Sequence, residues 1–394
     1  MTGATPAGSP PRPNLLRELS EQAVLEAIFR EGPLTRPEIA ERTGISKPTV
    51  SAAVARLVRA RLVHPAGERT GRRGRAPVAF VVDAAAGFVV GLDVEGSVLR
   101  IAATDIYGET LHEDELGTTG GGTRAIERRI TESVHDLSRR LAPTHGALLA
   151  MGVATPGVVD PATRRVTSLA YHVSASGAFE ALATLERRFG VPVLVDNDVN
   201  LAAVGEKRRG LASGVPTFVF VSVGAGVGMG IVIDDELYRG SRGAAGEIAY
   251  LPLAADPFDE RHRRLGGLED EAGAAGIVAA YGRAAGSPAA SAAEVLRRAQ
   301  AGDRAARDVV EATARHLGLA IASVCAVLDP QLVVLGGAVG GAAGLLGPVR
   351  AAAGRLVALP TRIETSVLGE RASLEGALAM GLHEARERLF SRPF

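Results

Sequence analysis

The sequence predicts an α/β protein in which a winged helix-turn-helix domain precedes a larger, two-lobed α/β body. Three observations lead to this prediction. At 394 residues the chain is too long for one ordinary core. Residues 1–85 carry 13 Lys/Arg against 8 Asp/Glu, whereas the rest carries 31 against 36, so only the first segment favours a polyanionic partner. Beyond residue 83, short β-branched runs alternate with stretches of helical periodicity.

Changes in composition divide the chain into four segments. We expect a disordered Pro/Gly/Thr-rich leader at 1–14, a winged helix-turn-helix at 15–82, a first lobe at 83–196 and a second lobe at 197–394. The C-terminal helix is a candidate to return to the first lobe. The leader lacks the apolar stretch of a secretory signal, and the single cysteine, Cys325, lies in an apolar run. We therefore expect a cytoplasmic protein with no membrane partner.

The first segment has the spacing of a helix-turn-helix. A helix opens near Leu19-Ser20 and ends at Gly32-Pro33, a second covers 36–42, and a third is capped by Ser46 and runs to about Leu62. The expected inward residues are Val24, Leu25, Ile28, Phe29, Ile39, Val50, Val54 and Leu57. This spacing places a small residue, Ala40, where the two helices cross and a glycine, Gly44, in the turn between them. It also places a β-branched residue, Val50, where it anchors the third helix.

The third helix and the segment after it carry the candidate DNA contacts. Residues expected to face outward from the helix are Ser46, Lys47, Thr49, Ser51, Ala52 and Arg56. A wing follows, with β-like residues 78–82 and a Gly-Arg tip formed by Arg69, Arg72, Arg73 and Arg75. A solvated basic loop on a protein-interaction module is the alternative interpretation.

The body shows two similar strand–turn–strand units. The first comprises strands at 88–94 and 98–104, and the second comprises strands at 217–223 and 230–233 around a glycine-rich turn. Helices are expected at 125–141, 178–189, 199–206 and 304–327. Further strands are expected at 148–153 and within 328–337, where the strand ends in two glycines. The two units form a weak internal repeat, which would suit a ligand held between two lobes.

A polar cluster ends the buried strand that begins at Val191. Asp196, Asn197 and Asp198 follow its β-branched residues directly. Ligands of open α/β sheets bind at the carboxyl ends of strands, and carboxylate and amide groups suit a polyhydroxylated ligand. The alternative is that Asp and Asn merely cap the following helix.

Five motifs in order resemble the ROK family (repressors, open reading frames and sugar kinases). They are residues 156–160, 196–200 with Glu206, 224–228, 246–248 and 330–337. The winged helix in front resembles that of the family's xylose and N-acetylglucosamine repressors. The resemblance covers about residues 15–389 and implies an actin/hexokinase-like (ribonuclease H-like) two-lobed fold.

The resemblance also implies a sugar site. In family kinases an Asn-Asp pair binds the sugar, and its aspartate takes the proton of the reacting hydroxyl; the matching residues are Asn197 and Asp198. Two family glutamates that bind sugar match Glu247 and Glu269, and Tyr250 stands in place of a family histidine. Carboxylates satisfied without a ligand are the alternative.

The parts of the family that handle phosphate and zinc are altered. Glu95 puts a carboxylate in the first turn, where small residues admit ATP, and Ala225 replaces a threonine in the second turn. Tyr250, Glu260, His262 and Gly267 replace the zinc ligands, which is a poor zinc set. We therefore expect no cofactor, with ATP and magnesium relevant only to a kinase.

The sequence thus favours a sugar-responsive transcriptional repressor rather than an enzyme. We expect it to bind operator DNA as a homodimer or homotetramer. One alternative is an ATP-dependent sugar kinase with a fused DNA-binding head, in which Asp198 is catalytic. The other is a DNA-binding protein whose body serves only as an oligomerisation scaffold.

Overall fold

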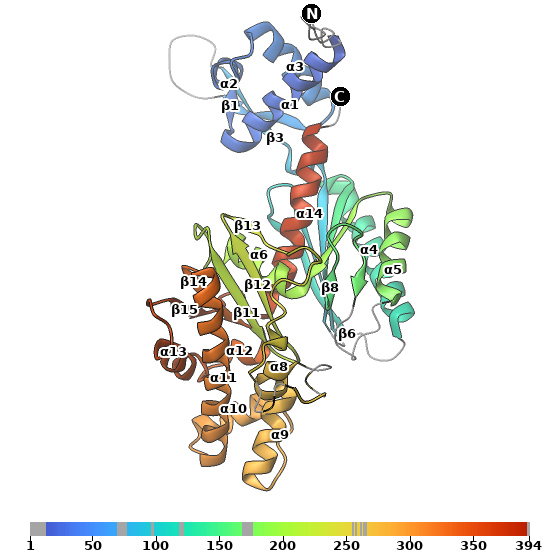
Figure 1. The fold of residues 1–394 in the computed structure, drawn as a ribbon. Coiled ribbons are helices and arrows are strands. Elements are labelled where there is room, and N and C mark those ends of the chain that lie inside the picture. The colour runs from blue at the N-terminus through green and yellow to red at the C-terminus, as the bar shows by residue number, and fades with distance from the viewer. Residues whose placement is uncertain are drawn as a thin grey trace, which may run out of the picture.

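The computed structural model describes residues 13–68, 77–95, 98–117, 122–167, 176–253, 256, 258–260, 262 and 266–391. Three parts follow one another along the chain: an N-terminal head and two α/β lobes (Figure 1). The predicted fold class is confirmed.

The head is a winged helix. Its elements are α1 (Pro13–Glu31), β1 (Leu34–Thr35), α2 (Arg36–Thr43), α3 (Lys47–Arg59), β2 (Val63–Glu68) and β3 (Val78–Val82), with the strands in the order β1-β3-β2. Val24, Leu25, Val50, Val54 and Leu57 are fully buried in its core, as the helical spacing predicts. The third helix ends earlier than expected, because Arg61 adopts a left-handed conformation that turns the chain into β2.

The first lobe is a five-stranded sheet in the order β10-β7-β4-β5-β6. Its elements are η1 (Ala84–Ala86), β4 (Phe88–Glu95), β5 (Val98–Asp105), β6 (Thr110–Gly117), α4 (Gly122–His145), β7 (Leu148–Thr155), β8 (Val158–Val159), β9 (Val166–Thr167), α5 (Ser176–Phe189) and β10 (Val193–Asn197). The helices α4 and α5 lie on one face of the sheet (Figure 1). Strand β6 was not predicted, because its outward residues form a largely polar edge without a clear apolar face.

The second lobe repeats this architecture, with strands in the order β13-β12-β11-β14-β15. Its elements are α6 (Asp198–Arg209), β11 (Phe218–Val223), β12 (Val227–Ile233), β13 (Glu236–Leu237), η2 (Ile248–Tyr250), α8 (Gly267–Ala272), α9 (Ala274–Ala285), α10 (Ala292–Gln300), α11 (Arg304–Leu328), β14 (Leu332–Gly336), α12 (Gly337–Gly340), α13 (Leu346–Gly354), β15 (Arg362–Thr365) and η3 (Gly369–Arg371). In both sheets an antiparallel three-strand meander is followed by two parallel strands. The two lobes therefore share one strand topology, which confirms the internal repeat inferred from the sequence.

Helix α14 (Ala372–Ser391) ends the chain and connects all three parts. It packs against α6, against β4 and β7 of the first lobe, and against α1 of the head. Figure 1 shows it running from between the lobes to the head. Among the described residues, α11 is the helix that is long and apolar enough to cross a membrane; half of its apolar window is buried within the protein, against α9, α10 and α13.

Candidate functional site

The recognition helix of the head is positioned by tight capping. Gly44 adopts a left-handed conformation (φ 69°) that turns the chain after α2, and the Ser46 hydroxyl caps α3 by accepting a hydrogen bond from the Thr49 amide at 3.4 Å. Ser46, Lys47 and Ser51 are exposed on this helix, whereas the Thr49 side chain is half-buried against Ser46. Short polar side chains with one cation therefore face solvent at the start of α3.

Arg56 lies differently from the outward position expected of it. Its guanidinium forms an ion pair with Glu21 of α1, whose side chain is buried. Buried carboxylates require such a partner, so Arg56 holds α3 onto α1. The wing residues Arg69, Arg72, Arg73 and Arg75 lie outside the described part of the chain.

A cleft opens between the lobes at the carboxyl ends of β4 and β11. Its described lining comes from both lobes and from the start of α14: Asp93, Glu95, Asp198, Val199, Ala202, Phe220, Ser222, Gly337, Ala338, Gly369, Glu370, Ala372 and Ser373. Two repeated sheets thus direct their strand ends into one space, where open α/β folds bind ligands. Of the predicted site residues, Asp198 lines this cleft.

Asn197 and Asp196 are occupied by structural hydrogen bonds. The Asn197 side chain caps α6 by accepting from the amides of Val199 and Asn200 at 2.9 and 3.0 Å, and its amide donates to the Gly157 carbonyl at 3.1 Å. Asp196 pairs with Arg239 at 2.7 Å across the lobes. The capping interpretation therefore holds for Asn197, which also fixes the direction in which Asp198 points.

Asp198 has the properties of a site carboxylate. It is the first residue of α6, and its Oδ1 accepts from the Val199 amide at 2.9 Å. Burial, together with the nearby carboxylates of Asp93 and Glu95, raises the pKa of Asp198 to about 7, against that backbone hydrogen bond. Near neutral pH this group can both accept a hydrogen bond from a hydroxyl and donate one.

Glu247, Glu269 and Tyr250 form a second acidic group next to the cleft. Burial raises the pKa of Glu247, and the charge of Glu269 raises it further; burial and both glutamates raise the pKa of Tyr250. Glu269 Oε2 accepts from the Val227 amide at 3.0 Å at the start of β12. Gly228 of the same strand lies against the side chain of Val199, the residue that follows Asp198. Of the five predicted sugar residues, Asp198 lines the cleft, Glu247, Glu269 and Tyr250 form a separate group beside it, and Asn197 caps α6.

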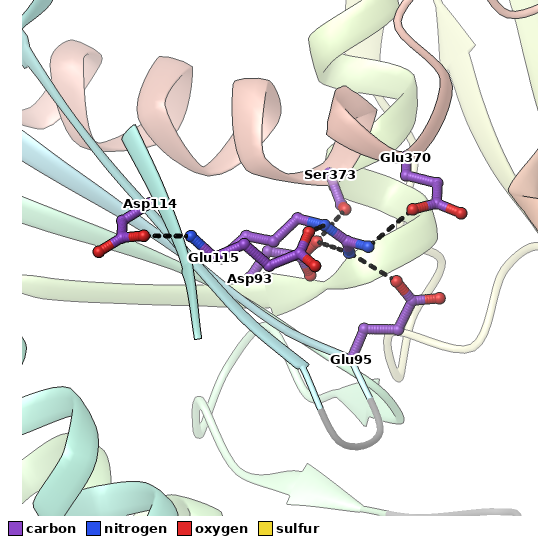
Figure 2. A network of polar contacts seen from close by, with 7 residues as sticks. Asp93, Glu95, Asp114, Glu115, Glu370 and Ser373 are labelled. Carbon is purple, nitrogen blue, oxygen red and sulfur yellow. Dashed lines mark hydrogen bonds and ion pairs between the residues drawn. The ribbon is translucent and has the colours of Figure 1, made fainter. Parts of the chain in front are cut away.

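An arginine that was not predicted from the sequence lies behind the lining of the cleft and pairs with three of its carboxylates. Arg100 of β5 has a side chain that is 10% exposed and is held by four carboxylates: its Nε donates to Glu115 (3.2 Å), its Nη1 to Glu95 (2.7 Å) and Asp93 (3.4 Å), and its Nη2 to Glu370 (2.9 Å). Figure 2 shows Glu95, Glu115 and Glu370 converging with Asp93 and Ser373. We call these residues the Arg100 cluster. The single cation of the strand Val98–Asp105, which lies between apolar residues, was the available signal.

The nucleotide side of the cleft fits ATP poorly. Glu95 and Glu370 stand at its mouth, both exposed, and Arg100 already spends its donors on carboxylates. Ala225 is exposed in the turn between β11 and β12 and offers no hydroxyl. Burial raises the pKa of Asp93, although the Ser373 hydroxyl bonds its Oδ2 at 2.8 Å. A triphosphate placed here would meet carboxylates with no free cation among the described lining residues.

The segment that replaces the zinc site is held by His262. This side chain is buried; its Nδ1 lies 2.8 Å from the Asp256 carbonyl and its Nε2 lies 3.4 Å from the Asp270 carboxylate. Tyr250 and Glu260 are exposed, and Gly267 begins α8, which carries Glu269. Within the described residues no group of three or more His, Cys, Asp or Glu could hold a metal ion. Packing around His262 therefore positions α8 and its glutamate.

Comparison with known proteins agrees with this geometry. The profile of the ROK family matches residues 89–384, and that of the MarR family matches residues 19–74. The chain is 24% identical over 335 residues to the xylose repressor of Caldicellulosiruptor bescii, with 82% of this chain and 84% of the relative covered. It is 31% identical over 282 residues to the glucokinase of Halalkalibacterium halodurans, with 66% of this chain and 83% of the relative covered.

A solved structure shares the whole fold. It is that of a ROK family transcriptional regulator, described as a homologue of the Escherichia coli Mlc protein; the TM-score is 0.74 and the identity 22%, with 95% of this chain and 99% of that chain covered. The similarity to the repressor and to this structure extends over most of the chain, whereas that to the glucokinase covers two thirds of it.

Proposed function

This chain belongs to the ROK family, and from that premise we propose that it is a sugar-responsive transcriptional regulator, a repressor in the simplest case, that acts in the cytoplasm. The head would bind operator DNA, and a sugar in the interlobe cleft would act as effector. The observation that carries the proposal is α14, a single helix that begins in the cleft wall and ends in the core of the head.

The two ends of α14 make specific contacts. At its N-terminus the Ser373 hydroxyl donates to Asp93 at 2.8 Å. At its C-terminus Leu389 is buried in the head's core, and Phe390 packs on Phe29 of α1 with ring centroids 5.4 Å apart. A change in lobe angle would therefore reach the head through one rigid element.

A second contact fixes the head from the first lobe. Tyr107 stacks on Phe29 at 5.1 Å and donates to the Val82 carbonyl at 3.0 Å, and the Arg386 guanidinium lies 4.8 Å from the Phe29 ring centroid. Arg386 also donates to the Ile106 carbonyl at 2.9 and 2.7 Å. Such contacts make the head part of the body, so lobe movement would reorient the recognition helix.

We propose that two chains bind one operator as a homodimer or homotetramer, with recognition helices in major grooves about 34 Å apart. Sugar would then change the distance between the heads. Such coupling requires that the sugar bind the DNA-competent and DNA-incompetent states with different affinities.

A gel-shift titration tests the proposal. DNA carrying the operator should be released by one cognate monosaccharide from a broad panel, and Glu247→Ala should abolish both the release and the thermal stabilisation by that sugar. DNA binding that no sugar alters, with no thermal stabilisation by any, would favour a body that is only an oligomerisation scaffold.

The kinase alternative has one specific support, because Asp198 keeps the position of the family's base and a glucokinase is 31% identical over part of the chain. Against it stand Glu95, Ala225 and the paired Arg100. A coupled ATPase assay with hexoses separates the two: we expect no turnover above a control without sugar. Turnover that Asp198→Asn removes would establish the kinase.

We also propose that the protein needs no zinc, since His262 and its neighbours take over the support of α8. Chelation with EDTA should then leave the melting temperature and DNA binding unchanged.

A further inference from the structure

The electrostatics of the cleft restrict what ligand it can hold. Four of its described lining residues carry carboxyl groups, two deep in the cleft (Asp93 and Asp198) and two at its mouth (Glu95 and Glu370). None of those lining residues is Lys, Arg or His. A ligand that enters the cleft between the lobes therefore passes two carboxylates and meets two more.

Arg100, the cation that pairs with the lining carboxylates, does not make the cleft favourable for an anionic ligand. Arg100 lies behind Asp93 and Glu95, and all three of its side-chain nitrogens are bonded to carboxylates. Four negative charges surround this single positive charge, so the Arg100 cluster as a whole repels anions. An anionic ligand group would have to displace a carboxylate to reach the guanidinium.

The group of residues beside the cleft is acidic as well. Glu247 and Glu269 lie close enough to each other for their charges to interact. A sugar bound between Asp198 and this pair would meet a carboxyl group at either end. A phosphate at either end of the sugar would thus be placed beside like charge, in a space from which water is partly excluded.

One acceptor in the cleft still lacks a donor. Asp93 is 1% exposed, its Oδ2 bonds Arg100 and Ser373, and its Oδ1 has no hydrogen-bond partner among the described residues. A buried carboxylate oxygen without a donor favours a ligand that supplies one, either a hydroxyl or an ammonium group. This observation points to donors, independently of the charge count.

We propose that the effector of this protein is an unphosphorylated sugar, neutral or cationic, and that the cleft excludes sugar phosphates and sugar acids. The proposal rests on the sugar-binding function proposed above and narrows it to one chemical class. The carboxylates that exclude the nucleotide also select the effector.

Matched pairs of ligands test the proposal on the intact protein. Calorimetric titrations would compare glucose, xylose, N-acetylglucosamine and glucosamine with their phosphates, and glucose with glucuronic acid, at constant ionic strength. We expect the sugar that binds to do so at least tenfold more tightly than its phosphate. A phosphate or acid that binds as tightly as its parent sugar would overturn the inference, whereas binding of no compound would defeat the sugar-binding function itself.

A variant pair tests the role of the carboxylates without any sugar. Glu95→Gln with Glu370→Gln should remove two of the four negative charges around Arg100, so that inorganic phosphate raises the melting temperature of the double variant relative to chloride at equal ionic strength. The wild type should show no such rise. The control is Glu127→Gln with Glu132→Gln on α4, which removes the same charge away from the cleft and should behave as the wild type.

Two results would contradict this expectation. Phosphate could stabilise the wild type as much as the double variant, which would mean that the cleft already accepts anions. Alternatively, phosphate could stabilise the α4 control as much as the double variant, which would mean that the net charge of the protein, and not the Arg100 cluster, determines the response to phosphate.

Discussion

Asp196 and Asp198 are two residues apart, yet their carboxylates meet opposite surroundings. Asp196 is buried against Arg239 and Asn200, which supply its hydrogen-bond donors. Asp198 faces Asp93 and Glu95 instead, and its hydrogen-bond donors among the described residues are backbone amides. The negative charge of Asp196 is therefore compensated by groups of the protein, whereas the Asp198 carboxyl group remains available to bind a ligand.

Asp198→Asn should change how stability depends on pH. The folded-state pKa of about 7 lies above the unfolded value of about 3.9, so the folded protein binds the extra proton and loses stability as pH rises between these values. The variant has no such loss. Its melting temperature relative to the wild type should therefore increase from pH 5 to pH 8, by a shift worth up to about 1.4 kcal/mol for each pKa unit.

Thermal unfolding at several pH values measures this. The exposed Asp234→Asn serves as the matched control for removal of one carboxylate. A difference between Asp198→Asn and wild type that stays constant from pH 5 to pH 8 would show that the carboxyl group is not held in its protonated form.

Alanine substitutions of Lys47 and Arg56, both on α3, should affect different properties, DNA binding in the first case and stability in the second. Lys47 is exposed, so Lys47→Ala should weaken DNA binding for all sequences and lower the salt slope by about 1, with an unchanged melting temperature. Arg56→Ala removes the close ion pair of the buried Glu21 carboxylate and leaves it with Arg17 at 3.9 Å, so it should destabilise the head by about 1–3 kcal/mol. Thermal unfolding and salt-dependent binding isotherms separate the two; equal salt slopes in both would assign Arg56 to DNA.

At the scale of elements, α14 approaches its neighbours closely through glycine. A Cβ at Gly376 would lie 1.8 Å from the Leu201 carbonyl oxygen of α6, and a Cβ at Gly152 of β7 would lie 1.9 Å from the Ala377 carbonyl oxygen. Backbone therefore packs on backbone at this junction. The contact fixes α14 relative to α6, the helix that begins with Asp198.

Gly376→Ala should accordingly destabilise the protein by about 1–3 kcal/mol or more, because the added methyl group forces α6 and α14 apart. Gly282→Ala is the control: it lies within helix α9 with no atom near the new Cβ, and should stabilise by up to about 1 kcal/mol. Chemical denaturation measures both. Equal effects of the two substitutions would mean that α6 and α14 can move apart to accommodate a methyl group without a loss of stability.

On the scale of the whole molecule, two lobes of the same strand order share one cleft, and helix α14 connects both lobes to the head. The buried Glu206 adds a further tie, since it accepts from the Leu211 amide at 2.8 Å and from the Ser366 hydroxyl, joining α6 to the segment that leads into α14. Cleft, α6 and α14 thus form one continuous packed unit. A packed unit of this kind can pass a rotation of one lobe to the head.

Phe390→Ala should uncouple the head from the cleft. Losing the ring contact with Phe29 removes the C-terminal anchor of α14, so sugar should still bind with the wild-type affinity while DNA release by sugar weakens. Calorimetry with sugar and gel shifts with and without it measure the two quantities. The control, Phe258→Ala, removes an exposed ring in the second lobe and should leave both unchanged. Full release by sugar in Phe390→Ala would exclude α14 as the route.

Local patterns in the sequence determined the helix-turn-helix, most strands and the repeated topology. Apolar spacing and turn residues decide these elements over short distances, as at Val50, Gly44 and Ser46. The ROK resemblance pointed to the cleft residue Asp198 and to Glu247 and Glu269 beside the cleft. The sequence did not predict β6 or β15, whose apolar pattern is short or weak.

Only the tertiary structure decided which charges neutralise one another. Arg56 faces the buried Glu21 rather than solvent, and Arg100 gathers carboxylates up to 270 positions away in the chain. Asn197 proved to be a cap, and α14 proved to join the cleft to the head. Ion pairs and close backbone contacts depend on distances between segments far apart in sequence, and no local pattern of residues encodes those distances.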